Sequence, residues 1–122
     1  MDTTITVVQV LLTIFASVAG FGKLLVPYNK LARVAWVNDF KPQHIRLISV
    51  LEVFTAVGLA VPLLVPSLAI FAPLAAVGMA LVMAGAMATH FRRSEYLNMV
   101  GNGMWLVLAL FVAYSKLVGL AV

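Results

Sequence analysis

The chain of 122 residues contains no cysteine, and only 10% of its residues are charged. Without cysteine it cannot form disulfides, thiolate metal sites or dithiol redox centres. Soluble domains carry about 25% charged residues, so the shortage of charge excludes an ordinary soluble domain. The chain is instead rich in apolar residues: 64% of its residues are hydrophobic, which places it among membrane proteins.

Four segments are long and apolar enough to cross a membrane, which takes about 20 residues per helix. They cover residues 4–25, 44–64, 67–90 and 98–120. A soluble four-helix bundle is excluded because its helices need a polar face, whereas these segments are apolar nearly all round. The sequence therefore predicts an all-α, polytopic membrane protein, a single domain over residues 1–122 built as a bundle of four transmembrane helices.

Positive charge is distributed unevenly between the two ends of this bundle. Of the eight Lys and Arg residues, all but Lys116 lie in or next to the first and third loops. Cytoplasmic loops of membrane proteins are enriched in Lys and Arg, so we expect these two loops in the cytoplasm and both termini outside. Because the basic residues lie between membrane spans, a nucleic-acid partner is not expected.

The first loop, residues 26–43, is too long for a tight turn and too apolar for a flexible linker. Leu31, Val34, Ala35 and Asn38 recur at helical spacing, with Trp36 beside them. This pattern predicts a short helix or re-entrant segment at the membrane interface, anchored by aromatic and basic side chains. Such a segment could also cover a cavity.

The third span carries an alanine at every fourth position: Ala72, Ala76, Ala80, Ala84 and Ala88. Small residues let membrane helices approach closely. The repeat predicts a helix-packing seam, and any part left uncovered could support a homodimer.

Polar residues from all four spans fall in the half of the bundle next to loops one and three. Glu52 lies about 12 Å into the second span, at a rise of 1.5 Å per residue, and an ionisable group at such depth costs at least about 2.5 kcal/mol unless it has a partner. The other candidates at this level are Lys23, Arg46, His90, Asn98, Asn102 and the aromatic Trp105. Together they predict a polar chamber centred on Glu52.

Each candidate also has a structural interpretation. Glu52 could pair with Lys23 and fix the helix register without any chemistry. Arg46 could extend to the lipid headgroups, and His90 could be an interfacial residue. The two asparagines could form hydrogen bonds between helices.

Five stretches of the chain resemble the DoxX family, in particular its short DoxX-like members from bacterial membranes. They are GFGKLL at 20–25, WVNDF at 36–40, LEVFTAVGLAVP at 51–62, AGAMATHFRRSE at 84–95 and the asparagine-bearing start of the fourth span. The resemblance implies a four-helix bundle in the bacterial inner membrane, with Lys23, Glu52 and His90 at positions that are often polar in the family. It also implies an accessory role in respiratory or sulfur-linked redox systems. The bundle is similar to that of vitamin K epoxide reductases, but their cysteine pairs are missing here.

The first functional hypothesis is a binding protein whose polar chamber holds the head of an apolar molecule such as a quinone or an isoprenoid. Bundle cores commonly hold such sites. No cofactor is evident from the sequence, and a quinone is the candidate. The expected partners are the lipid bilayer, the apolar molecule, a separate redox protein and a second copy of the chain.

The alternative is a membrane enzyme in which an uncharged Glu52 acts as a general acid on an apolar substrate, with His90 or Asn102 orienting the reacting group. The sequence contains no nucleophile motif. No metal site is expected, because His44 and His90 lack a carboxylate at ligand spacing. A proton-coupled exporter is less favoured, since small multidrug exporters have their carboxylate in the first span and the best-known dual-topology members show little charge bias.

Overall fold

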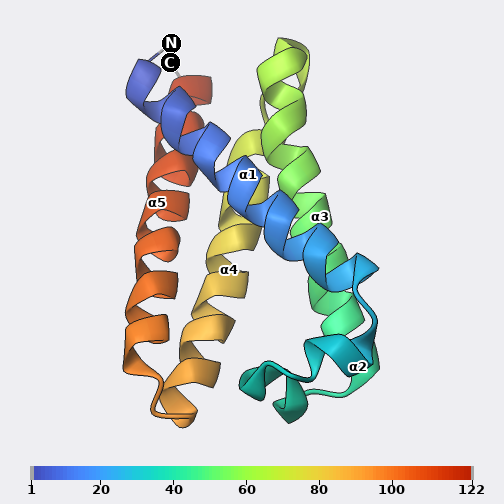
Figure 1. Ribbon diagram of the computed structural model, residues 1–122. Coiled ribbons are helices and arrows are strands. Elements are labelled where there is room, and N and C mark those ends of the chain that lie inside the picture. The colour runs from blue at the N-terminus through green and yellow to red at the C-terminus, as the bar shows by residue number, and fades with distance from the viewer. Residues whose placement is uncertain (1, 122) are drawn as a thin grey trace.

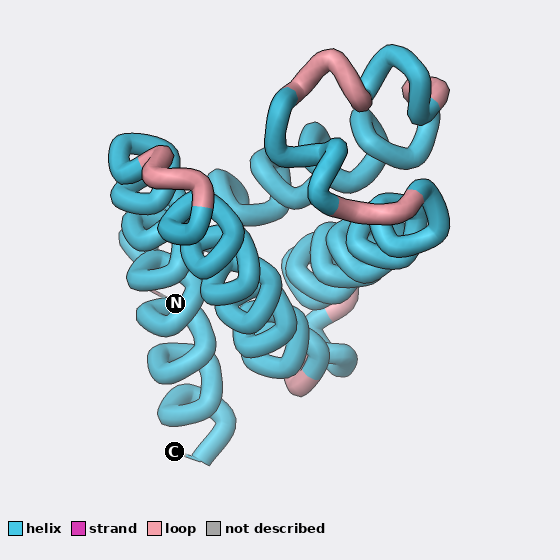
Figure 2. Tube along the Cα trace, turned by 90° about the horizontal axis from the view of Figure 1, so that it is seen from below, coloured by secondary structure: helices cyan, strands magenta, loops and turns pink. Residues whose placement is uncertain are grey.

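The computed structural model describes residues 2–121 and consists of helices joined by short connections (Figures 1 and 2). The four long helices are α1 (Thr3–Leu25), α3 (Pro42–Leu64), α4 (Phe71–Arg92) and α5 (Tyr96–Ala121), and each is long and apolar enough to cross a membrane. Three short elements lie between them: α2 (Tyr28–Leu31), η1 (Ala35–Asp39) and η2 (Pro66–Leu68). The predicted four-helix membrane bundle is confirmed.

The helix ends follow from local sequence. The Asp2 carboxylate accepts a hydrogen bond of 2.8 Å from the Thr4 backbone N–H and caps α1. Pro42 occupies the first turn of α3, where its missing N–H costs nothing. Between α4 and α5, Ser94 adopts a left-handed backbone conformation (φ 59°), and the Glu95 N–H donates to the His90 carbonyl over 2.8 Å. This tight turn brings the side chains that follow α4 back towards His90.

The helices pack as two pairs. The most extensive contacts join α4 to α5 and α1 to α3, and contacts between α3 and α4 hold the pairs together. Both termini lie at one end of the bundle, while α2, η1 and the α4–α5 turn lie at the other (Figure 1). We call the second end the loop-one end.

Helices α3 and α4 touch closely in the half near the termini. A Cβ added at Gly58 would lie 2.8 Å from the Ala75 Cβ, so only glycine fits there, and one added at Gly78 would lie 3.8 Å from the Thr55 hydroxyl oxygen. Towards the loop-one end the two helices diverge (Figures 1 and 2). Small residues thus close one half of the bundle, as membrane-helix packing requires, and leave the other half open.

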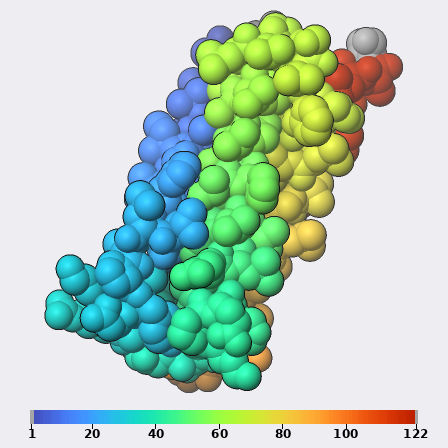
Figure 3. All heavy atoms as spheres, turned by 90° about the vertical axis from the view of Figure 1, so that its right-hand side faces the viewer, coloured from blue at the N-terminus to red at the C-terminus, as the bar shows by residue number. Residues whose placement is uncertain are grey.

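The closed half contains a continuous core to which all four long helices contribute. Its fully buried members include Leu12, Leu59, Ala76, Ala109 and Val112, each with 0% exposure. The outer surface of α3 carries exposed apolar side chains, among them Leu51 and Phe54, and Figure 3 views the molecule from the side on which α3 lies. The protein is therefore built to contact lipid on its outside.

The alanine repeat of α4 packs as predicted in its first half only. Ala72, Ala76 and Ala80 are buried, whereas Ala84 and Ala88 are exposed, so only the first half of the predicted seam packs within the bundle and the second half is the uncovered part. The reason is geometric: with 3.6 residues per turn, a step of four residues advances about 40° too far, which sums to about 160° over the whole repeat. The alanine stripe therefore rotates from the core to the lipid-facing surface.

Candidate ligand-binding site

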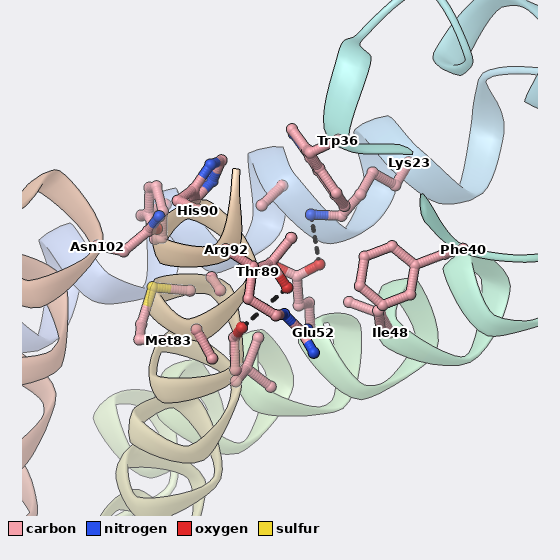
Figure 4. Close-up of a pocket in the computed structure, with 16 residues that line it drawn as sticks. Lys23, Trp36, Phe40, Ile48, Glu52, Met83, Thr89, His90, Arg92 and Asn102 are labelled. Carbon is pink, nitrogen blue, oxygen red and sulfur yellow. Dashed lines mark hydrogen bonds and ion pairs between the residues drawn. The ribbon is translucent and has the colours of Figure 1, made fainter. Parts of the chain in front are cut away.

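A cavity of about 490 Å³ lies at the loop-one end, where α3 and α4 have diverged (Figure 4). Its wall is mostly apolar and includes Phe15, Trp36, Phe40, Ile48, Val82 and Met83. Its polar groups are Lys23, Glu52, Thr89, His90, Arg92 and Asn102. The lining comes from α1, η1, α3, α4 and α5, so the cavity exists only in the assembled bundle.

A buried ion pair joins α1 and α3 at the wall of this cavity. Lys23 Nζ lies 2.7 Å from Glu52 Oε1, and the two side chains are 18% and 6% exposed. Helix α1 reaches α3 at this level because Gly20 leaves no bulk between them: a Cβ there would lie 2.9 Å from the Val53 backbone nitrogen. Lys23 also occupies the last turn of α1, where the helix dipole favours a cation. The structural partner predicted for Glu52 is present, and both members of the pair face the cavity.

Residues of η1 cover the ion pair from the loop-one end. Lys23 Nζ lies 5.7 Å from the centre of the Trp36 ring, within cation–π range. The Trp36 ring packs edge-on against Phe40 and His90, with ring centres 6.0 and 6.2 Å apart. The first loop thus forms short helical segments, as predicted, and covers the cavity.

A chain of charged groups holds this cover to the α4–α5 turn. Arg93 donates two hydrogen bonds from one nitrogen to the Asp39 carboxylate, at 2.9 and 3.0 Å, and thereby ties η1 to the end of α4. Glu95 Oε1 lies 2.8 Å from His90 Nδ1 and 3.4 Å from Arg93 Nε. We call Asp39, Arg93, Glu95 and His90 the tether. The hydrogen bond from His90, together with the nearby Arg93, lowers the pKa of the Glu95 carboxyl from its ordinary value, and the hydrogen bond to Asp39 raises the pKa of Arg93.

Sequence reasoning placed seven residues at the site, and the structure brings four of them to the cavity: Lys23, Glu52, His90 and Asn102. Arg46 and Asn98 are exposed and lie outside the lining. Arg46 precedes Glu52 by six residues, which separates the two side chains by about 120° around α3.

Asn98 and Trp105 occupy supporting positions. The Asn98 backbone carbonyl accepts a hydrogen bond of 3.0 Å from the Asn102 side chain, within the first turns of α5. Trp105 stacks on Phe15 with ring centres 4.2 Å apart, so it lies one layer behind the cavity wall rather than in it.

Sequence reasoning missed Thr89 and the tether residues Asp39 and Glu95. Thr89 is buried, and its hydroxyl donates to the Gly85 carbonyl over 3.0 Å. Satisfying a hydroxyl within its own helix is common in membrane spans, so this threonine left no pattern to detect. Asp39 lies in the WVNDF segment and Arg93 in AGAMATHFRRSE, but nothing in either stretch indicates that the two side chains meet across 54 positions of sequence.

The fold and the site define a multi-pass membrane protein, a four-helix bundle whose diverging half contains a cavity with one buried ion pair. The model of the DoxX-like family matches residues 7–112. The chain belongs to the DoxX-like family. No curated protein and no solved structure gives a significant match.

Proposed function

We propose that this protein binds a small apolar molecule with a polar head, a quinone or an isoprenoid-like compound, in the cavity between α3 and α4. The observation that carries the proposal is the combination of an apolar wall with one buried ion pair. Small-molecule sites generally have volumes of about 300–1,000 Å³, apolar walls and a few well-placed polar groups. The cavity, at about 490 Å³, has these properties.

Lys23 is the residue best placed to hold the polar head. Its ammonium group has three N–H donors, and Glu52 is its anionic partner. The remaining donors suit a carbonyl or hydroxyl oxygen of a bound molecule. Glu52 holds the ammonium in position, while Trp36 covers it on the loop-one side.

The same ion pair favours binding over catalysis by Glu52. A general acid must carry a proton in the resting state, whereas Glu52 lies at ion-pair distance from a lysine. His90, the other candidate catalytic residue, is already engaged with Glu95. Both candidate catalytic side chains are therefore already held by other side chains, which suits a binding site.

The proposal also includes a location and an orientation. We propose that the protein lies in a bacterial inner membrane with loop one and the α4–α5 turn on the cytoplasmic side, because the basic residues concentrate at that end of the bundle. The accessory role beside a redox protein rests on the resemblance to DoxX proteins. Recovery of a redox enzyme with the tagged protein from native membranes would support that role, and recovery of the protein alone would count against it.

Mass spectrometry of small molecules retained by the purified protein tests the binding proposal directly. The wild type should retain one specific quinone or isoprenoid, and both Glu52→Gln and Lys23→Gln should lose it while remaining folded. Arg46→Gln is the matched control, since Arg46 is exposed and outside the cavity. Recovery of the same bulk lipids from all four proteins would refute the proposal.

A further inference from the structure

We propose that the ligand reaches this cavity from the bilayer, through an opening between the loop-one halves of α3 and α4, and that its tail stays in that opening among the lipid chains. The inference rests on the proposed function and adds a route and a shape to it: a single-tailed amphiphile whose head enters first. The observation behind this inference is that the residues on one side of the cavity wall are exposed, whereas those on the other sides are buried or half-buried.

The opening begins where the small-residue contact between α3 and α4 ends. Gly58 against Ala75 and Thr55 against Gly78 hold the helices together. Beyond these contacts, Glu52 on α3 and Val82 on α4 both line the cavity. The gap is therefore a built feature of the bundle, set by the point at which the small residues stop.

One edge of α4 belongs both to the cavity wall and to the outer surface. Gly85, Ala88 and Arg92 line the cavity and are exposed, whereas every other lining residue is buried or half-buried. Their spacings of three and four place them on one side of the helix. A Cβ added at Gly85 would meet no atom within 4 Å. The cavity thus opens to the outside along this edge.

The remaining sides of the cavity are covered by protein. In Figure 4, α1 forms the rear wall, with α4 on one side and α3 on the other. The Phe15–Trp105 stack joins α1 to α5. At the loop-one end Trp36 and Phe40 cover the cavity, and the Asp39–Arg93 pair holds their helix in place. An apolar molecule therefore has a path into the cavity through the edge that faces lipid.

The residues at this edge also indicate the shape of the occupant. Glycine and alanine leave room for a narrow chain to pass between the helices, and Arg92 lies at the loop-one end of the same edge, where arginine side chains extend to the lipid headgroups. A molecule with a compact head beside Lys23 and one flexible apolar tail fits this arrangement.

Cysteine labelling tests the route without any ligand, because the natural chain has no cysteine. Ala19→Cys places a thiol on the rear wall, on α1. In lipid nanodiscs we expect this thiol to react faster with pyrenyl maleimide, which partitions into the bilayer, than with a charged, water-soluble methanethiosulfonate, each rate being taken relative to that of the same reagent with a free thiol in water. Adding Gly85→Leu should slow the maleimide reaction at least about tenfold, equivalent to about 1.4 kcal/mol on the barrier, and Ala88→Leu should slow it in the same direction.

Ala84→Leu is the matched control, since Ala84 is exposed on the same helix but lies outside the cavity wall; it should leave the rate unchanged. The proposal is overturned if the charged reagent labels as fast as the maleimide, if Gly85→Leu has no effect, or if the maleimide reaches the thiol only after unfolding. Because ligand retention is measured separately, a failure of the route is distinguishable from a failure of the binding proposal.

Discussion

The two halves of this bundle are built from the same four helices but differ in what lies between them. Near the termini, small residues bring α3 against α4, and the core is fully buried. Its polar contact is similarly tight: the buried Gln9 side chain donates to the Leu59 carbonyl over 2.7 Å and joins α1 to α3. At the loop-one end the helices part around a cavity, and the contacts across them are charged.

Under the proposed function, one half of the bundle supplies stability and the other half binds the ligand. Helices in lipid associate through close packing rather than through the hydrophobic effect, so the closed half should supply most of the stability. The open half lacks that close packing and contains the cavity instead. Binding sites in general draw on the less stable parts of a structure.

The largest effect on stability is expected when a glycine is replaced by leucine in the closed half, compared with the same replacement in the open half. Gly58→Leu forces a side chain into a contact where even a Cβ would lie 2.8 Å from Ala75, and it should lower the free energy of unfolding by about 1–3 kcal/mol or more. Gly85→Leu enters open space and should not lower it; replacing a glycine inside a helix should raise it by about 0.5–1 kcal/mol. Reversible unfolding in mixed micelles measures both values. Equal losses would show that the two halves are packed alike.

A second comparison separates the two roles of the buried ion pair. Lys23→Gln and Glu52→Gln should each remove ligand retention. In a double-mutant cycle with the combined variant, the pair should show a coupling energy of about 0.5–3 kcal/mol, the range for residues in direct contact. A coupling of zero would mean that the 2.7 Å contact contributes nothing to the fold, and would leave binding as its only role.

The division between the halves also explains what could be predicted from the sequence. The four spans follow from run length and hydropathy alone. The Lys23–Glu52 pair was predictable as well, because an ionisable group deep in an apolar span requires a partner, and only a few residues share its depth. Such arguments fix the depth of a residue and leave its direction around the helix open.

The predictions failed for the side of the helix on which a residue lies. Arg46 has nearly the right depth but the wrong side of α3, and Ala84 and Ala88 have the right spacing but have rotated out of the core. The Asp39–Arg93 contact could not be predicted from the sequence, because it depends on how loop one folds back over the bundle. Depth can be counted along the chain, whereas direction and loop placement require the packed structure.

A smaller effect is expected from releasing the cover of the open half. Arg93→Gln removes the two hydrogen bonds to Asp39 and should let η1 move away from the cavity. In a Trp105→Phe background, where Trp36 is the one remaining tryptophan, its emission should shift to the red and become more accessible to iodide. Arg92→Gln is the neighbouring control, since within residues 2–121 no ion pair involves Arg92. A shift of equal size in both variants would rule out a specific tether.

The smallest effect is a pH response confined to the tether. The hydrogen bond from His90 and the charge of Arg93 lower the pKa of Glu95 below its ordinary value of 4.5. A carboxyl whose pKa is lowered by folding stabilises the folded state above its unfolded pKa, and this contribution is lost as the pH falls through the lower, folded value. Trp36 emission should therefore be constant at neutral pH and shift to the red below about pH 4.5, the ordinary pKa of the carboxyl.

Glu95→Gln should remove the part of this response that comes from Glu95, and an identical titration in that variant would assign the transition to another carboxyl such as Asp39. The closed half contains no such pair among the described residues, so the red shift of Trp36 should come from the tether, because the helix contacts of the closed half are made by apolar side chains and the uncharged Gln9.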